Sequence, residues 1–85
     1  MGKALTLFYD PVGDILVVER LPAYPEQVTR SIGDGILVRE RPGDGVIESV
    51  EVWNFTRRAA EREGLSIPLI GEFRQEQGRP KRAIA

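Results

Sequence analysis

The chain has 85 residues, of which 41% are hydrophobic and 29% are charged, and its formal net charge is −1. This length provides for one domain with a thin core, which favours extra burial against a second chain. Because the sequence has no cysteine and no histidine, it has no disulfides, thiolate metal sites, cysteine nucleophiles or imidazole bases. We therefore expect a non-catalytic protein without a cofactor, and a homo-oligomer, most simply a dimer.

The charge is unevenly distributed along the chain. Residues 1–71 carry 8 basic and 11 acidic side chains, for −3, whereas residues 72–85 carry 4 basic and 2 acidic, for +2. The polar stretch 75–85 lacks apolar periodicity, which predicts a flexible basic tail after a single domain over residues 1–74. Without a signal-like or membrane-spanning apolar run, and without cysteine, we expect a cytoplasmic protein that does not contact membranes.

Five runs rich in apolar and β-branched residues predict strands. In chain order they are residues 4–9, 15–20, 27–32, 36–41 and 46–53. Asp-Pro and Gly within residues 10–14 predict a hairpin between the first two strands, and Pro-Gly-Asp-Gly at 42–45 predicts one between the last two. Pro22 and Pro25 interrupt the pattern and predict a loop before the third strand.

The sequence pattern changes to a helical one after Trp53. Asn54 or Thr56 is placed to cap a helix over residues 57–63, and Gly64 is placed to end it. A second short helical turn is suggested by apolar residues at near-helical spacing; they are Leu65, Leu69, Ile70 and Phe73. The fold class is therefore α+β: an antiparallel sheet of four to five strands, built from β-hairpins and followed by one C-terminal helix.

The second predicted strand is apolar on both sides. Residues 15–18 read ILVV, and successive side chains of a strand point to opposite faces of the sheet. In so small a domain, both faces of this strand need a cover. The helix can supply one, and we expect a second subunit to supply the other.

Two sequence blocks resemble a known family. Residues 9–17 (YDPVGDILV) resemble the YDPxxDxLYI opening of the small bacterial proteins known as domain of unknown function 2283. Residues 34–38 (DGILV) and 45–52 (GVIESVEV) resemble that family's DGVILDYDEDGxVVGIEIL block, and Asn54 falls where the family often has Asn. The resemblance covers residues 5–55. It implies a β-rich fold with a trailing helix, no established activity or cofactor, and an antitoxin-like role beside a small toxin-like partner.

Four aspartates at predicted turns are candidate ligands for a hard cation such as Mg²⁺ or Ca²⁺: Asp10, Asp14, Asp34 and Asp44. Asp10 and Asp14 share one turn and are the metal candidates, which makes a metal-dependent hydrolase one alternative function. The competing interpretation is that each Asp stabilises its own turn by accepting a hydrogen bond from a nearby backbone N–H. We favour the turn interpretation because Gly or Pro accompanies each of the four.

Basic residues suggest nucleic-acid binding as a second alternative function. Arg57, Arg58 and Arg62 lie on the predicted helix, and a group in the tail is suited to phosphate contact: Arg79, Lys81 and Arg82. The calculated pI of about 5.4 counts against this function, because nucleic-acid-binding domains normally carry a basic surface.

Three aromatic residues are candidates for contact with a protein partner. Trp53 and Phe55 flank the junction between the last strand and the helix, where one of them is expected to fill the seam. The other interpretation makes them anchors at an interface, where aromatic residues are enriched. Tyr24, on the proline-bounded loop, is the better candidate for an exposed contact, and the competing interpretation is that it packs under the loop.

Overall fold

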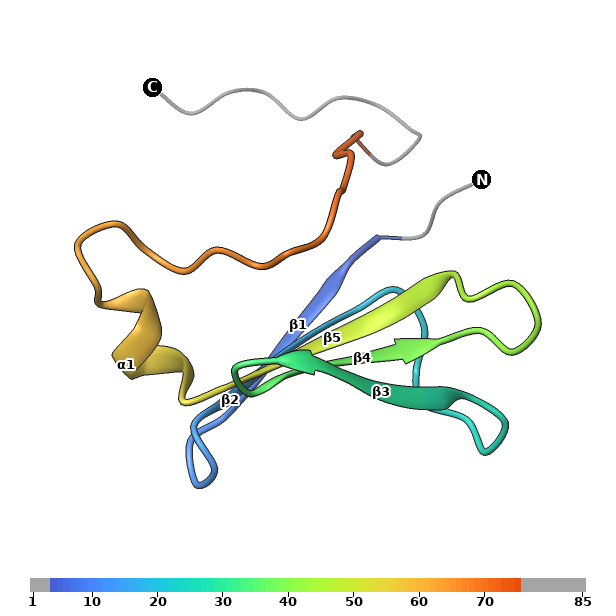
Figure 1. Cartoon of the computed structure of the whole chain (residues 1–85), viewed down its shortest axis with the longest axis horizontal. Helices are drawn as coiled ribbons and strands as arrows, with labels where there is room; N and C mark the ends of the chain where they lie inside the picture. Colours follow the sequence, from blue (N-terminus) through green and yellow to red (C-terminus); the bar gives the residue numbers. More distant parts are fainter. Residues whose placement is uncertain (1–3, 76–85) are drawn as a thin grey trace.

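The computed structural model describes residues 4–75 and contains five strands and one short helix. The elements are β1 (Thr6–Asp10), β2 (Ile15–Glu19), β3 (Val28–Gly33), β4 (Ile36–Glu40), β5 (Ile47–Trp53) and α1 (Phe55–Ala59). All strands belong to one antiparallel sheet in the order β1-β2-β5-β4-β3 (Figure 1). The predicted α+β fold is confirmed.

Turn residues position the hairpins as the sequence predicted. β1 pairs with β2 through a turn in which Asp14 adopts a left-handed conformation with φ of 54°. β4 pairs with β5 across the glycine-rich turn at 42–45. The segment between β2 and β3 carries the chain past β5 to the opposite edge, so β5 lies at the centre of the sheet (Figure 1).

Two irregularities interrupt the ladders on this far side of the sheet. The register of β3 against β4 shifts between Ser31 and Gly33, which leaves Ile32 as an extra residue. The register of β4 against β5 shifts between Arg39 and Glu40, which leaves Glu48 unpaired in β5. Such bulges bend a strand and redirect the inserted side chain.

The predicted helix boundaries are wrong. α1 ends at Ala59, and the residues that follow it form turns, whereas the sequence pattern favoured a helix over residues 57–63. Asn54 occupies the N-cap position with φ of 56°, but its side chain makes no capping hydrogen bond. A helix of five residues is marginal on its own, so its stability depends on contacts with the sheet. The second helical turn is also absent, because residues 64–75 contain no helix.

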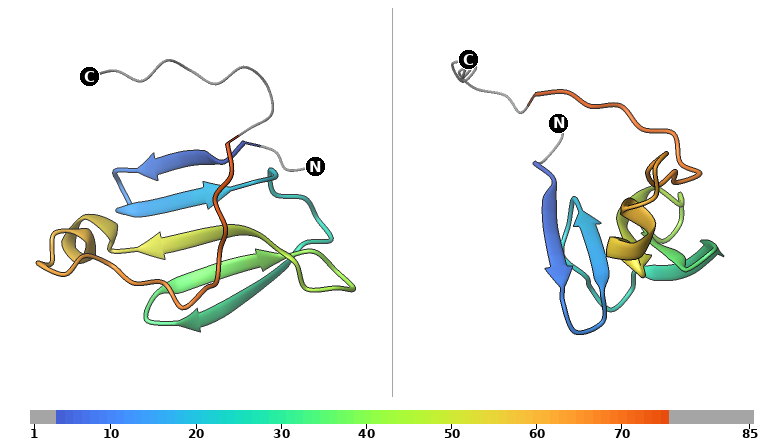
Figure 2. Two further views of the ribbon diagram at one scale, coloured as in Figure 1. Left: turned by 90° about the horizontal axis from the view of Figure 1, so that it is seen from above. Right: turned by 90° about the vertical axis from the view of Figure 1, so that its left-hand side faces the viewer.

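One face of the sheet carries the core. Ile36, Val38 and Val52 are at most 2% exposed, and the strand register places Ile36 opposite Val52 on this side. Tyr9 lies on the same side, and its ring centroid is 6.1 Å from that of Phe55 in α1. We call this side the covered face, because the chain after α1 passes over it, while α1 itself lies just beyond the end of β5 (Figures 1 and 2).

The chain after α1 completes this cover. Leu65, Ile67 and Leu69 are half-buried and alternate with exposed residues, as expected for an extended segment with one side against the sheet. Beyond them, Ile70 and Phe73 are exposed. No helix within residues 4–75 is long and apolar enough to cross a membrane.

Candidate functional site

The face of the sheet opposite α1 is the candidate binding surface, and we call it the open face. Register places Phe8 opposite Val17, Val17 opposite Glu51, and Glu51 opposite Leu37, in one row across four strands. Paired residues of an antiparallel sheet share a face, so this row alternates with the core residues of the covered face. Neither α1 nor the chain after it lies over this side, and the β2–β3 loop passes it only at the end of the sheet away from α1, where Ser49 is 3% exposed (Figure 2).

The open face is apolar at both ends. Phe8 in β1 is 53% exposed, and Trp53 at the end of β5 is 44% exposed. Between them lie the half-buried side chains of Ile15, Val17 and Leu37, with Ile15 directly opposite Trp53. Half-exposed aromatic rings next to aliphatic side chains form a surface that loses water favourably when a second protein covers it.

An ion pair lies at the centre of this face. Arg39 Nη2 in β4 is 2.5 Å from Glu51 Oε2 in β5, and only 12% of the Glu51 side chain is exposed. A carboxylate with so little access to water depends on its charged partner, because an unpaired buried charge is costly. The sequence pattern did not predict this pair. Its signal was two opposite charges on the same face of the predicted β4–β5 hairpin.

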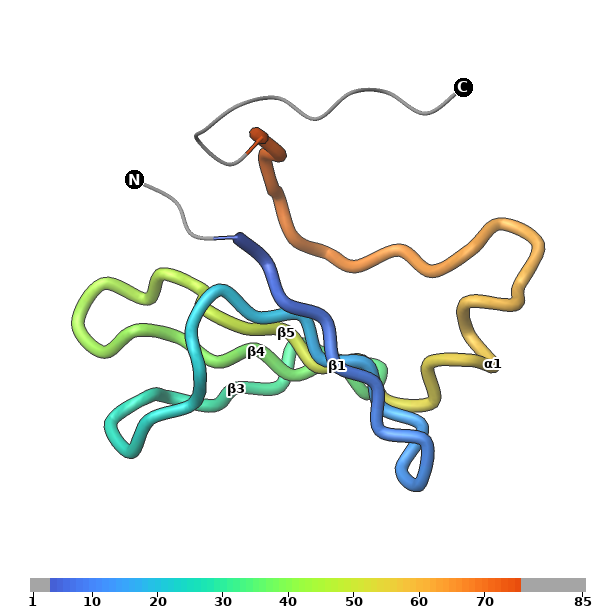
Figure 3. The backbone as a smooth tube through the Cα atoms, turned by 180° about the vertical axis from the view of Figure 1, so that it is seen from behind, coloured from blue at the N-terminus to red at the C-terminus, as the bar shows by residue number. Residues whose placement is uncertain are grey.

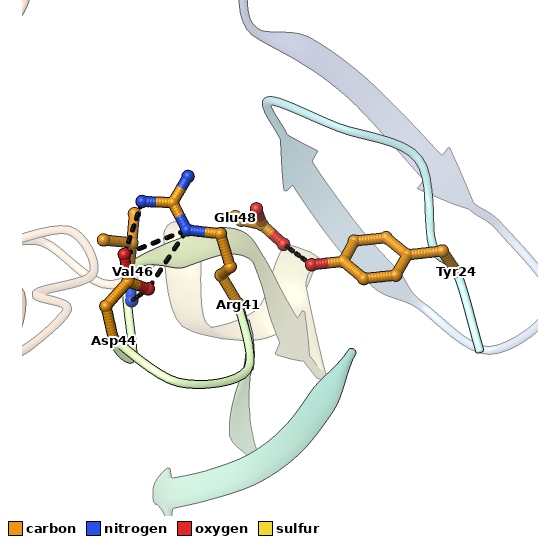
Figure 4. Close-up of polar contacts among 5 residues, drawn as sticks. All are labelled: Tyr24, Arg41, Asp44, Val46 and Glu48. Atoms are coloured by element: carbon orange, nitrogen blue, oxygen red, sulfur yellow. Dashed lines mark hydrogen bonds and ion pairs between the residues drawn. The ribbon is translucent and has the colours of Figure 1, made fainter. Parts of the chain in front are cut away.

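A second polar cluster lies at the bulge of β5. Glu48 is only 3% exposed, and its Oε1 accepts a hydrogen bond from Tyr24 Oη at 2.5 Å (Figure 4). The same oxygen accepts a second hydrogen bond from Gln27 Nε2 at 3.0 Å. The bond to Glu48 raises the pKa of Tyr24 to about 12, and the bond from Tyr24 lowers the pKa of Glu48, with Gln27 adding to that shift. These bonds attach the β2–β3 loop to the sheet. Tyr24 is half-buried and its hydroxyl donates inward to Glu48, which agrees with the alternative that it packs under the loop rather than with an exposed contact.

The β4–β5 turn is closed by its own ion pair, beside this cluster in Figure 4. Arg41 Nη2 lies 2.6 Å from Asp44 Oδ2, and Asp44 Oδ1 accepts a hydrogen bond from the backbone N–H of Val46 at 3.2 Å. The hydrogen bond from Arg41 lowers the pKa of Asp44, and the bond from Val46 lowers it further. Asp44 therefore stabilises its own turn.

Asp10 and Asp14, the metal candidates, are both occupied by contacts within the chain. Asp10 Oδ1 accepts hydrogen bonds from the backbone N–H groups of Val12 at 3.0 Å and Gly13 at 3.3 Å. Asp34 adopts a left-handed conformation, and its carbonyl oxygen accepts a hydrogen bond from Arg58. Among residues 4–75, no three Asp or Glu side chains gather as a group that could hold a metal ion.

Asp14 connects the first hairpin to the helix. Its carboxylate accepts hydrogen bonds from Tyr9 Oη at 2.6 Å, from the Thr56 backbone N–H at 3.1 Å and from Thr56 Oγ1 at 2.9 Å. The bond from Tyr9 is the main cause of a lowered pKa of Asp14, and Thr56 adds to the shift. Asp14 thus satisfies a first-turn N–H of α1, the role that the sequence pattern had assigned to Asn54 or Thr56 themselves.

The other candidates separate into different places. Phe55 packs against Tyr9 on the covered face, whereas Trp53 belongs to the open face. Arg58 donates to the Asp34 carbonyl oxygen at the β3–β4 turn, while Arg57 and Arg62 are exposed. The tail candidates for nucleic acid lie outside the described residues; they are Arg79, Lys81 and Arg82.

No family model, curated protein or solved structure matches this chain. The resemblance to domain of unknown function 2283 therefore stays a prediction from the two sequence blocks.

Proposed function

We propose that this protein is a non-catalytic, oligomeric binding module that docks another protein on the open face of its sheet. The observation that carries the proposal is the row from Phe8 to Leu37, over which neither α1 nor the chain after it lies, with the exposed Trp53 beside it. An antitoxin-like role, in which the bound protein is a small toxin, is the concrete form of this function. The cysteine-free composition fits work in the cytoplasm.

The chemistry of the open face supports a protein partner. Aromatic residues and arginine are enriched at the centres of protein interfaces, where they combine a large apolar area with a directional polar group. Trp53 and Phe8 provide the apolar area here, and the Arg39–Glu51 pair provides the polar element. A partner that covers Leu37 and Trp53 would also dehydrate this ion pair, so it must complement both charges.

The test is a tagged pull-down from the source cells with the full chain and two variants. Trp53→Thr removes the exposed ring but keeps a residue that favours strands, and we expect it to lose the captured protein. Ile70→Lys removes an exposed apolar side chain that lies away from the open face, and we expect it to retain the captured protein. Equal capture by both variants would overturn the open face as the docking surface.

The antitoxin-like form makes a further demand on the captured protein. It must slow growth when expressed alone, and coexpression of the present chain must restore growth. Trp53→Thr should fail to restore it, whereas Ile70→Lys should restore it fully. A captured protein with no effect on growth would leave the binding module in place and remove the antitoxin-like role.

A further inference from the structure

The outer edge of β1 is the least protected strand edge of the sheet. β1 pairs with β2 on one side, and no segment within residues 4–75 pairs with its other side (Figure 3). Its side chains are exposed on both faces: Leu7 by 62%, Phe8 by 53% and Tyr9 by 45%. A regular strand with unpaired backbone groups and apolar side chains is a template for pairing with another chain.

The opposite edge, β3, is guarded, by which we mean that a charged side chain and a bulge hinder its pairing with another strand. Arg30 lies in the middle of this strand, its side chain is 54% exposed, and its Nη2 is 2.5 Å from Glu40 Oε2 on β4. The bulge at Ile32 interrupts the ladder two residues later. A charged side chain and a bulge are two of the devices that prevent an edge strand from pairing. The sheet therefore offers one edge for assembly.

We propose that β1 pairs antiparallel with β1 of a second copy. The two-fold axis of this dimer passes midway between Phe8 and the Phe8 of the second copy. This inference rests on the proposed oligomeric binding module and names the surface that assembles it. The pairing joins two five-stranded sheets into one continuous sheet. A contact between identical surfaces closes at two copies, whereas pairing of β1 with β3 would continue into a filament. The guarded β3 edge disfavours the filament.

The side chains of β1 determine this register. Opposed residues of an antiparallel pair lie on the same face of the sheet. A two-fold axis perpendicular to the sheet therefore runs between the two copies of one residue, which pairs with its own copy. With Phe8 at the axis, all five residues of β1 are paired, Leu7 opposes the partner's Tyr9, and Thr6 opposes the partner's Asp10. Asp10 is the charged residue of the strand, and this register places it opposite a hydroxyl rather than another carboxylate.

The pairing also enlarges the docking surface. Phe8 lies on the open face of one copy, and the partner's Phe8 would lie beside it on the same side of the joined sheet. The open faces of the two copies then form one surface with a pair of aromatic rings at its middle. The second copy thus adds to β1 at its edge and leaves Val17 and Leu37 available to a protein partner.

Cysteine substitution tests the edge and the register directly, because the full chain contains no cysteine. Residues that oppose each other in a sheet have Cα atoms about 4.5–5.5 Å apart, within the range that a disulfide spans. We expect Phe8→Cys to form a covalent dimer under mild oxidation at least about 10-fold faster than Thr29→Cys, a matched exposed position on the open-face side of β3. Leu7→Cys should also be slow, because its two copies are out of register by two residues.

The outcomes separate this inference from the proposed function. Equal rates for all three variants would overturn pairing through β1 and leave that edge to a strand of another protein. A faster reaction of Leu7→Cys would overturn the axis at Phe8. Loss of capture by Trp53→Thr together with slow linking of Phe8→Cys would keep the binding module and remove only its assembly through β1.

Discussion

The two edges of the sheet have opposite characters. β3 lies next to β4, which contributes two of the three fully buried apolar side chains, and it carries an ion pair and a bulge. Within residues 4–75, β1 has no buried residue, no ion pair and no bulge, and its three central side chains are about half exposed. The difference shows how one small sheet can be closed to assembly on one side and suited to it on the other.

We expect the largest effect on stability from a substitution in the core beside β3, and a much smaller effect from one in the exposed strand β1. Val38→Ala removes two buried carbon atoms from β4 and should reduce the free energy of unfolding by about 2 kcal/mol. Leu7→Ala, on β1, should reduce it by less than about 0.5 kcal/mol, because Leu7 is 62% exposed. Urea unfolding of both variants, at a dilution that keeps the chain monomeric, measures the difference. Equal losses would contradict the contrast between the two edges.

Removing the guard from β3 should change the assembly more than the stability. Arg30→Val deletes the exposed charge from the middle of the strand and breaks the ion pair with Glu40. We expect assemblies larger than a dimer in light scattering, because each copy would then offer a second apolar edge. Arg57→Val makes the same change on the exposed surface of α1 and should leave the mass unchanged.

Acid should weaken the attachment of the β2–β3 loop. Hydrogen bonds from Tyr24 and Gln27 hold the pKa of Glu48 below its ordinary value of 4.5. A carboxyl group with a lowered pKa in the folded protein stabilises the fold above that ordinary value and loses this contribution as the pH falls. Glu48→Gln should therefore unfold more easily at pH 7 and show a shallower loss of stability below pH 4.5. Glu26→Gln, an exposed position on the same loop, should retain the wild-type slope.

The sequence predicted the sheet well because its signals are local. Turn residues lie between runs of β-branched residues at both predicted hairpins, and each hairpin formed where these residues stand. The helix was misplaced because its first turn is stabilised by Asp14, 42 residues away in sequence. Neither the helical periodicity nor the capping pattern around Asn54 can predict a contact with a residue so distant in the sequence.

The candidate site was only partly predictable for the same reason. The apolar run of β2 indicated that two faces need cover, and the structure places the chain after α1, rather than the helix itself, over one of them. The Tyr24–Glu48 bond joins residues 24 positions apart and depends on a bulge, so the sequence alone could not decide between an exposed tyrosine and one packed under its loop. The protection of the β3 edge becomes apparent only in the folded sheet, where Arg30 and Glu40 are diagonal neighbours across the β3–β4 ladder.

The most direct test of assembly through β1 is sedimentation equilibrium of the wild type, Phe8→Lys, Phe8→Glu and an equimolar mixture of the two variants. We expect the wild type to show twice the 9.5 kDa mass of one chain at about 100 μM, and each variant alone to show a single chain. The mixture should return to the doubled mass, because the two-fold axis would place lysine opposite glutamate. A wild type that remains at the mass of one chain, or variants that still dimerise alone, would contradict the account.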